Sequence, residues 1–324
     1  MLLLSIFLYN GNMDKYNSYS GKFLDPKMTR DGNARAHVKL KSLETLWFNT
    51  GTLCNLECVN CYIESSPKND ELTYITHEEV LSYLDEIRDQ NISVSEIGLT
   101  GGEPFMNPDI IKIMGSAMAR GFKMLVLTNA MRPMMRHEKA LSDLNKKFPG
   151  QLALRVSTDH FAKEIHQKER GERSWEPMIK GLKWLGDNGF DVHVAGRTFT
   201  HEDDNKLRLG YADLFAKLGI KIDAYNPHAL ILFPEMGEQE DVVEITTDCW
   251  EILNVNPDHM MCSSSRMIVK HRGEDKPAIM ACTLLPYDQQ FNMGADLTSA
   301  RRNVSLNHPF CSTFCVLGGA SCSN

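Results

Sequence analysis

Residues 45–62 read TLWFNTGTLCNLECVNCY, and this stretch decides how the rest of the chain is interpreted. Its first six residues are an apolar run typical of a buried strand. Cys54, Cys58 and Cys61 then follow at C-x3-C-x2-C spacing, with Tyr62 directly after them. Three cysteines within eight residues, in a loop at the end of a strand, indicate a metal site.

Three thiolates at this spacing can bind three irons of a [4Fe–4S] core. The fourth iron then has no protein ligand, and a small molecule with an amine and a carboxylate can chelate it. The alternative is a zinc site, which usually takes four ligands in C-x2-4-C pairs with a second pair downstream. No nearby Cys or His supplies a fourth ligand to the first loop, so an iron–sulfur cluster is favoured.

A regular alternation of strands and helices extends outward from this loop. Apolar runs predict strands at residues 45–50, 96–100, 123–128, 152–157, 191–196 and 220–225. Periodic apolar faces, caps and terminal glycines predict helices at residues 76–90, 108–121, 174–189 and 205–218. Thr76 and Glu79 have the spacing of a capping box. The predicted fold class is α/β, with a parallel sheet curved into a partial (β/α)6 TIM-like barrel.

We expect three regions along the chain. Residues 1–40 form an irregular N-terminal segment, residues 41–236 form the barrel, and residues 237–324 form a small Cys-rich C-terminal module. The division at residue 236 rests on the end of the alternating pattern. It also rests on the positions of the six late cysteines, which all lie from residue 249 onward.

Composition limits the class of protein. The chain has 35 Lys and Arg against 42 Asp and Glu, so its formal charge of −7 argues against a nucleic-acid surface. The opening run MLLLSIFL is shorter than the roughly 20 apolar residues of a membrane span and lacks the basic start of a secretory signal. Met13 is an alternative start. Nine cysteines without an export signal argue against disulfides, so we expect a cytoplasmic protein without a membrane partner.

The cysteine loop resembles the cluster motif of the radical S-adenosylmethionine (SAM) superfamily. The second hallmark of that family is matched by Leu99-Thr100-Gly101-Gly102-Glu103-Pro104, at the end of the second predicted strand. The resemblance implies that Cys54, Cys58 and Cys61 hold a [4Fe–4S] cluster. It also implies that the Thr100–Glu103 segment receives the amino group of SAM, with Tyr62 beside the cluster.

Further matches follow later strands. Asn129 ends the third predicted strand, and Ser157 lies in Ser157-Thr158-Asp159, which resembles the S-x-D segment of the family. Arg170 precedes Gly171 as in the Arg-Gly pair near the SAM carboxylate. The resemblance therefore implies that Asn129, Ser157 and Arg170 contact SAM. Arg197 ends the fifth predicted strand and is added to the cofactor site.

The late cysteines resemble, in shortened form, the SPASM/twitch extension that carries auxiliary clusters in this superfamily. The resemblance implies one auxiliary [4Fe–4S] cluster, held by Cys262, Cys282 and two of Cys311, Cys315 and Cys322. Spacing does not decide which two. A structural zinc knot and plain buried cysteines are the alternatives, and Cys249 has no assigned role.

The resemblance covers residues 44–324 and implies an enzyme. One electron from a reductant such as flavodoxin or ferredoxin would cleave SAM to methionine and a 5′-deoxyadenosyl radical, which takes a hydrogen atom from the substrate. No residue is assigned a catalytic role in that transfer.

For the substrate, we expect a small molecule. About 40 residues precede the first predicted strand, too few for the peptide-recognition domain that many peptide maturases carry. A peptide substrate is the alternative, and a non-enzymatic electron carrier is a remote one. Tyr225, Asn226 and His228 follow the sixth predicted strand and are expected to face the substrate.

Overall fold

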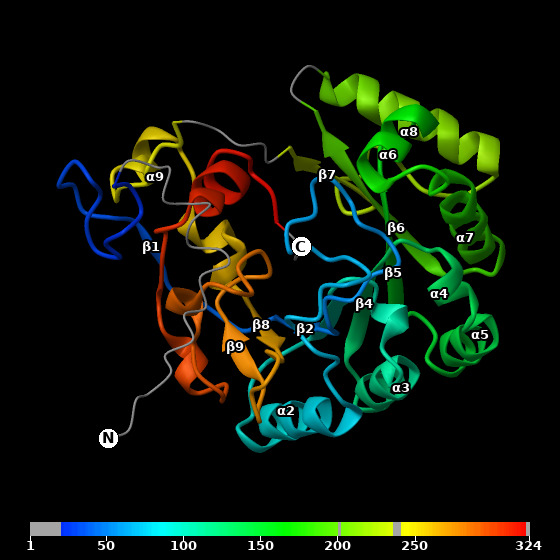
Figure 1. The fold of residues 1–324 in the computed structure, drawn as a ribbon, viewed down its shortest axis with the longest axis horizontal. Helices are drawn as coiled ribbons and strands as arrows, with labels where there is room; N and C mark the ends of the chain where they lie inside the picture. Colours follow the sequence, from blue (N-terminus) through cyan, green and yellow to red (C-terminus); the bar gives the residue numbers. More distant parts are fainter. Residues whose placement is uncertain (1–20, 200–201, 236–240, 322–324) are drawn as a thin grey trace, which may run out of the picture.

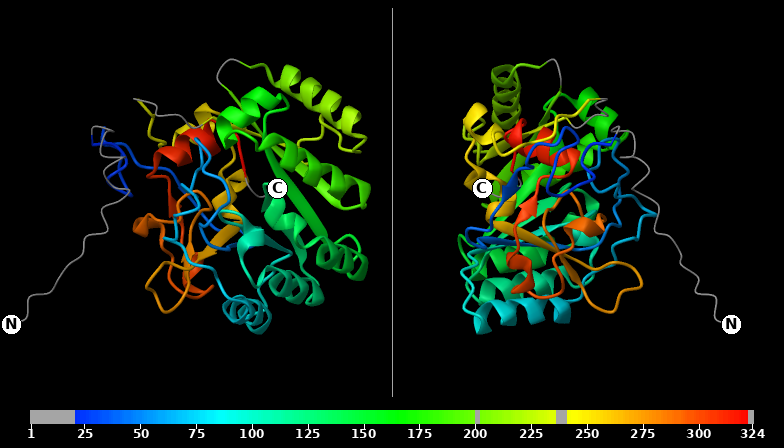
Figure 2. Two further views of the ribbon diagram at one scale, coloured as in Figure 1. Left: turned by 45° about the vertical axis from the view of Figure 1, so that its right-hand side comes forward. Right: turned by 90° about the vertical axis from the view of Figure 1, so that its left-hand side faces the viewer.

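The computed structural model describes residues 21–199, 202–235 and 241–321. The apolar run at residues 1–8, Met13 and Cys322 lie outside the described residues. Eight strands form one sheet in the order β7-β6-β5-β4-β3-β2-β8-β9, and all neighbours are parallel except β9, which runs antiparallel to β8. The sheet curves into a partial barrel, with the long helices packed along its outer face (Figures 1 and 2).

The barrel follows the predicted alternation of strand and helix. Its strands are β2 (Thr45–Asn49), β3 (Glu96–Thr100), β4 (Lys123–Thr128), β5 (Leu152–Asp159), β6 (Asp191–Thr198) and β7 (Leu230–Pro234). Its helices are α2 (His77–Asp89), α3 (Ile110–Ala119), α4 (Arg132–Met135), α5 (Glu138–Lys147), α6 (Lys163–Arg170), α7 (Trp175–Asp187) and α8 (Asp204–Leu218). The α/β fold class and the partial barrel are therefore confirmed, as is the capping box of Thr76 and Glu79 at the start of α2.

One predicted strand is wrong. Residues 220–225 form no strand, and the sixth strand of the barrel is β7, which pairs with β6 from Leu230 onward. Ile220 instead packs against the backbone of Gly186 in α7, so this apolar residue serves the helix layer. The predicted substrate-facing residues Tyr225, Asn226 and His228 therefore precede β7 and lie at the amino-terminal ends of the strands. The cysteine loop lies at the carboxyl ends.

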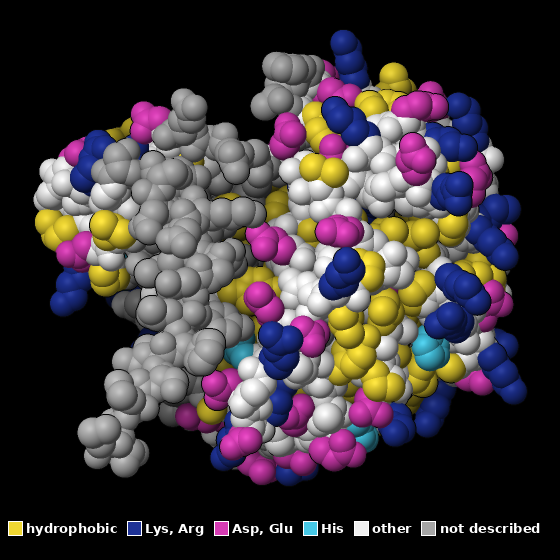
Figure 3. Space-filling model, viewed as in Figure 1, with side chains coloured by type: hydrophobic (Ala, Val, Ile, Leu, Met, Phe, Trp, Pro, Cys, Tyr) yellow, Lys and Arg dark blue, Asp and Glu magenta, His cyan; other side chains and the backbone are white. Residues whose placement is uncertain are grey.

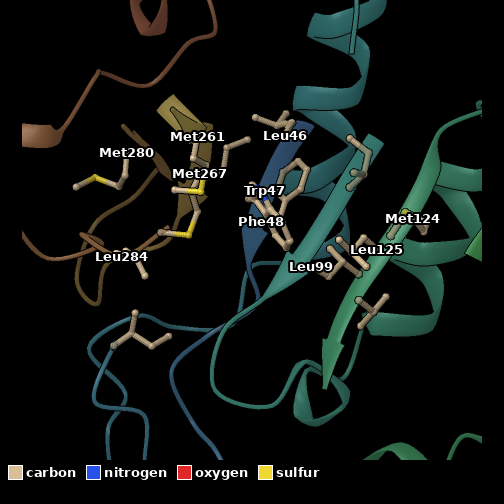
Figure 4. Close-up of a cluster of buried hydrophobic side chains, with 14 of the residues drawn as sticks. Leu46, Trp47, Phe48, Leu99, Met124, Leu125, Met261, Met267, Met280 and Leu284 are labelled. Atoms are coloured by element: carbon tan, nitrogen blue, oxygen red, sulfur yellow. The ribbon is translucent and has the colours of Figure 1, made fainter. Parts of the chain in front are cut away.

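The cysteine-rich C-terminal region adds strands to the same sheet. β8 (Ser265–Val269) pairs in parallel with β2, and β9 (Ala278–Met280) follows it. Figure 4 shows the apolar core running from the barrel strands across β2 to Met261, Met267 and Leu284. At the N-terminal side, β1 (His37–Val38) pairs with β10 (Val304–Ser305). The predicted domain division at residue 236 stays a prediction, and the hydrophobic core is continuous across it.

The surface carries charges of both signs. On the face seen in Figure 3, Lys and Arg side chains lie among Asp and Glu side chains. No helix in the described part of the chain has both the length and the apolar character to cross a membrane.

Two glycines allow the close packing that fixes the barrel. A Cβ atom on Gly98 in β3 would lie 2.3 Å from the Trp47 ring, so the buried indole occupies the space above this glycine. A Cβ atom on Gly181 in α7 would lie 1.8 Å from the carbonyl oxygen of Ala130. Ala130 directly follows the predicted cofactor residue Asn129, so α7 packs against the turn that carries it.

We predict that Gly181→Ala lowers the free energy of unfolding by about 1 to 3 kcal/mol, because the added methyl group overlaps backbone that cannot swing aside. Urea unfolding followed by circular dichroism measures the change. The matched control is Gly115→Ala in α3, where the new Cβ would lie 3.5 Å from Leu144 and the helix gains about 0.5 to 1 kcal/mol. Equal effects of the two changes would contradict the packing argument.

Candidate active site

The predicted site residues gather at one edge of the sheet. The cysteine loop follows β2, the Gly101–Glu103 segment follows β3, and Asn129 follows β4. Arg197 lies near the end of β6. Because these strands are parallel, their carboxyl ends meet at the same edge, where barrel enzymes build their sites.

The cysteine loop and the glycine segment are joined backbone to backbone. The Thr50 amide donates to the Thr100 carbonyl (2.8 Å), and the Gly102 amide donates to the Gly51 carbonyl (2.8 Å). The Glu103 amide donates to the Leu53 carbonyl (3.2 Å). Gly101 has φ +140°, and a Cβ atom on Gly102 would lie 2.3 Å from the Leu53 oxygen. Glycine is therefore required here because two loops approach each other closely.

Backbone amides donate hydrogen bonds to two thiols of the first loop, and the Arg170 charge lies near the third. The Leu56 amide donates to Cys54 Sγ (3.4 Å), and the Ser65 amide donates to Cys61 Sγ (3.3 Å). Burial raises the pKa of Cys54 to about 12. Burial also raises the pKa of Cys58, against the lowering effect of the Arg170 charge.

This donor set fits an iron–sulfur cluster. Amide donors and an arginine stabilise sulfur in its thiolate form, the form that binds metal, and metal binding displaces the thiol protons. No three His, Cys, Asp or Glu side chains among the described residues are gathered as one metal ion would require. A [4Fe–4S] core instead needs its thiolates spread over the corners of a cube.

The Glu103 side chain is hydrogen-bonded to the end of β4. Its carboxylate accepts from Thr128 Oγ1 (2.8 Å), from the Asn129 amide (2.8 Å) and from the Phe105 amide (3.2 Å). Burial raises the pKa of Glu103 to about 7, against these hydrogen bonds, which lower it. Glu103 thus fixes the glycine segment to the next strand, and its predicted contact with the SAM amino group stays a prediction.

Asn129 reaches from β4 to the cysteine loop. Its Nδ2 donates to Asn55 Oδ1 (2.9 Å) and lies 4.0 Å from Cys54 Sγ. Of the other residues predicted to bind SAM, Thr100 lies at the end of β3, where its carbonyl accepts from the amide and the hydroxyl of Thr50. Ser157 lies half-buried in β5.

The Asp159 carboxylate pairs with both Arg170 and Arg197, which the sequence predicted as separate cofactor residues. Arg170 pairs with the Asp159 carboxylate through Nε (2.8 Å) and Nη2 (3.2 Å), and Arg197 Nε lies 3.8 Å from the same group. These charges hold the pKa of Asp159 below its usual range, although burial acts in the opposite direction. Arg197 also donates to the Tyr62 hydroxyl and stacks on its ring, 4.9 Å from guanidinium carbon to centroid.

Asp159 is a site residue that was not expected from the sequence. It stands in the quoted Ser157-Thr158-Asp159 motif, but nothing in the spacing shows that two cations far along the chain converge on it. Its backbone has φ +50°, a left-handed conformation that is uncommon for residues other than glycine, although aspartate adopts it more readily than most.

Four late cysteines line one cavity in the C-terminal region. They are Cys262, Cys282, Cys311 and Cys315, and the remaining lining is apolar (Met260, Met261, Leu284, Leu285, Phe291, Val304, Leu306 and Phe310). The Leu284 amide donates to Cys282 Sγ (3.3 Å). Burial raises the pKa of Cys262 to about 11 and that of Cys311 to about 12. Cys249 lies elsewhere, in α9 (Cys249–Ile252), where it contacts Thr246.

The two cysteine sites are connected by aromatic side chains. Tyr62, next to Cys61, meets Phe314 edge to face with centroids 5.7 Å apart. Phe314 lies in the short helix η6 (Cys311–Val316), between Cys311 and Cys315, which line the second cavity. The Tyr287 hydroxyl donates to the Ile63 carbonyl (2.9 Å). The C-terminal region therefore packs directly on the first cysteine loop.

Comparisons with known proteins agree with this geometry. Residues 48–209 match the family model described as the Radical SAM superfamily. "Antilisterial bacteriocin subtilosin biosynthesis protein AlbA" of Bacillus subtilis is 31% identical over 202 residues, which are 60% of this chain and 40% of that protein. "Probable GTP 3',8-cyclase" of Saccharolobus islandicus is 25% identical over 182 residues, 56% of this chain and 55% of that protein. The chain thus spans about half the length of these relatives or less.

A solved structure supports the fold. Streptococcus suis SuiB bound to its precursor peptide SuiA superposes with a TM-score of 0.57 at 14% identity, over 79% of this chain and 63% of that one. At this identity the likeness concerns the fold alone.

We predict that Asp159→Asn lowers the free energy of unfolding by about 3 to 5 kcal/mol, because two buried guanidinium groups lose their counter-charge. Chemical denaturation measures the loss. Asp187→Asn, which removes the exposed partner of Lys183, is the control and should change stability by less than about 1 kcal/mol. A loss at position 159 no larger than that at position 187 would show that the ion pairs do not matter.

Proposed function

Since the chain belongs to the Radical SAM superfamily, we propose that it is an enzyme that cleaves SAM at a [4Fe–4S] cluster held by Cys54, Cys58 and Cys61. The observation that carries this proposal is the cysteine loop itself. It lies at the carboxyl edge of the sheet and is joined by backbone hydrogen bonds to the Gly101–Glu103 segment. The amide donors to Cys54 and Cys61 and the charge of Arg170 near Cys58 support it.

When bound, the cluster and SAM supply a one-electron cleavage that gives methionine and a 5′-deoxyadenosyl radical, which removes a hydrogen atom from the substrate. The chain's own groups position and shield this chemistry. Arg170 is our candidate for the SAM carboxylate, because its charge lies near Cys58 and Asp159 fixes its orientation. Arg197 holds Tyr62 through its hydroxyl and ring, and Tyr62, next to Cys61, would help to exclude water from a cluster held there.

The polar groups of the other strand ends complete the SAM site in this proposal. The backbone of Gly101 and Gly102 offers carbonyl groups to the SAM amino group, while the Thr100 carbonyl, bound by Thr50, and Glu103, bound to Thr128, hold that backbone in place. Asn129 and Ser157, from β4 and β5, contact the rest of SAM. The electron comes from a reductant such as flavodoxin or ferredoxin.

An auxiliary [4Fe–4S] cluster forms the second part of the proposal, with Cys262, Cys282, Cys311 and Cys315 as its ligands. The four thiols share one cavity whose other walls are apolar, and this fits a cluster shielded from water. Cys311 and Cys315 are the two of the three late candidates that lie within the described residues, and both line the cavity. Both clusters need reduced thiols, so the cytoplasm expected from the sequence remains the proposed location.

For the substrate we propose a peptide, in place of the small molecule expected from the sequence. The support is the identity to a bacteriocin biosynthesis protein, the highest among the relatives described above. The small-molecule reading is kept as a second candidate because the cyclase relative covers a similar part of the chain. The two substrate classes can be distinguished by incubating the reconstituted enzyme with SAM and peptides encoded beside its gene, followed by mass spectrometry. A mass change in a peptide supports the peptide substrate. No change in any such peptide favours the second.

We predict that Cys58→Ala abolishes formation of 5′-deoxyadenosine after anaerobic reconstitution and dithionite reduction, because two thiolates do not hold the cluster. Chromatography of the SAM products gives the readout. Cys249→Ala, a cysteine outside both sites, should leave the product yield unchanged. Undiminished cleavage by the Cys58 variant would contradict the mechanism.

We further predict that Cys315→Ala lowers the iron content toward that of one cluster while SAM cleavage persists in part. The wild-type chain should bind about eight irons, and the variant about four, by the ligand count of two cubane clusters. Colorimetric iron and sulfide assays measure this, with Cys249→Ala again as the control. Unchanged iron in the Cys315 variant would remove this residue from the ligand set.

A further inference from the structure

Arg266 is a buried arginine bound to the backbone of Cys262, one of the residues that line the cavity of the proposed auxiliary site. It lies in β8 with 1% of its surface exposed. Its guanidinium donates to four backbone carbonyls: those of Cys262 (2.6 Å), Ser265 (2.7 Å), Ala300 (2.9 Å) and Arg302 (3.1 Å). These contacts join the segment that carries Cys262 to the segment at residues 299–302.

No carboxylate accompanies this charge. Among the residues that the structure describes, Arg266 forms no ion pair with Asp or Glu, whereas two other buried arginines do: Arg35 pairs with Glu244, and Arg197 lies 3.8 Å from Asp159. A buried charge is costly unless an opposite charge or a metal centre compensates it. Carbonyl hydrogen bonds satisfy the donors of Arg266 but leave its positive charge uncompensated.

The nearby groups able to become anionic are cysteines of the cavity. Burial lowers the pKa of Arg266 to about 10, and the Cys262 and Cys282 thiols act in the opposite direction. Arg266 therefore stays charged at neutral pH. The carbonyl that it binds most closely belongs to Cys262 itself, so the cation lies directly behind one of the proposed cluster ligands.

We propose that Arg266 is the counter-ion of the auxiliary cluster and sets its reduction potential. This inference rests on the proposed cluster at Cys262, Cys282, Cys311 and Cys315. A [4Fe–4S] core held by four thiolates is negatively charged, and one-electron reduction adds a further negative charge. A fixed, buried positive charge beside the ligand segment stabilises the reduced form more than the oxidised form, so it raises the potential. Arg266 is thus a positioning and tuning residue, and it contributes no ligand.

A purely structural role is the competing explanation, since Arg266 cross-links three segments through carbonyls. The two roles differ in what the conservative variant does. Lys at position 266 keeps the charge but loses most of the carbonyl contacts, whereas Gln keeps some hydrogen bonding but removes the charge.

The test uses the full chain, reconstituted anaerobically with iron and sulfide, as wild type, Arg266→Gln and Arg266→Lys. Redox titration with dithionite, followed by electron paramagnetic resonance, measures the potential of each cluster, and the signal that changes on adding SAM identifies the SAM cluster. We expect Arg266→Gln to shift the auxiliary cluster to a more negative potential and to leave the SAM cluster unchanged. Arg266→Lys should stay close to wild type.

Arg302→Gln is the matched control, because its exposed guanidinium donates to the Asn292 carbonyl outside the cavity, and it should shift neither cluster. An auxiliary potential that is the same in Arg266→Gln as in wild type would overturn the inference. So would loss of auxiliary iron in both the Gln and the Lys variants, because the carbonyl contacts would then be the function of Arg266. Iron for only one cluster in the wild-type chain would instead refute the proposed auxiliary site, a distinct result.

Discussion

The close backbone contact between residues 51–53 and Gly101–Glu103 is the constraint on which the site depends. Two loops that follow neighbouring parallel strands meet there without side chains between them. The contact fixes the position of Cys54 in the loop after β2 and the position of Glu103 in the segment after β3. Glu103 then binds the end of β4, so a single chain of hydrogen bonds connects three strand ends. A side chain at either glycine would separate the loops and move the first thiol.

Buried charge is the second organising feature. Asp159 gathers Arg170 and Arg197 beside the first cysteine loop, and Arg197 in turn holds Tyr62. Such ion pairs gain little net stability over apolar packing, but they are costly to leave half-made, and this fixes their geometry. Arg266 departs from this rule because it has carbonyl partners and no carboxylate. In our proposal the auxiliary cluster compensates this charge.

The C-terminal region is part of the architecture of the barrel. β8 extends the sheet from β2, the strand that leads into the first cysteine loop. Tyr62 meets Phe314 between the two cysteine sites, and Tyr287 binds the carbonyl of Ile63. The regions that carry the ligands of both proposed clusters therefore share one continuous hydrophobic core.

The sequence by itself determined the features that are local. The cysteine spacing, the glycine segment one strand later and the strand–helix alternation depend on neighbours along the chain, and they predicted the fold class, which is confirmed, and the first candidate site. The strand predicted at residues 220–225 was wrong because apolar residues alone do not distinguish a strand from a segment that packs on a helix, as Ile220 does. The tertiary structure alone decided that Cys311 and Cys315 share a cavity with Cys262 and Cys282, and that Asp159 joins two distant arginines. Those relations are set by where the chain folds back in space, and residue spacing carries no record of that.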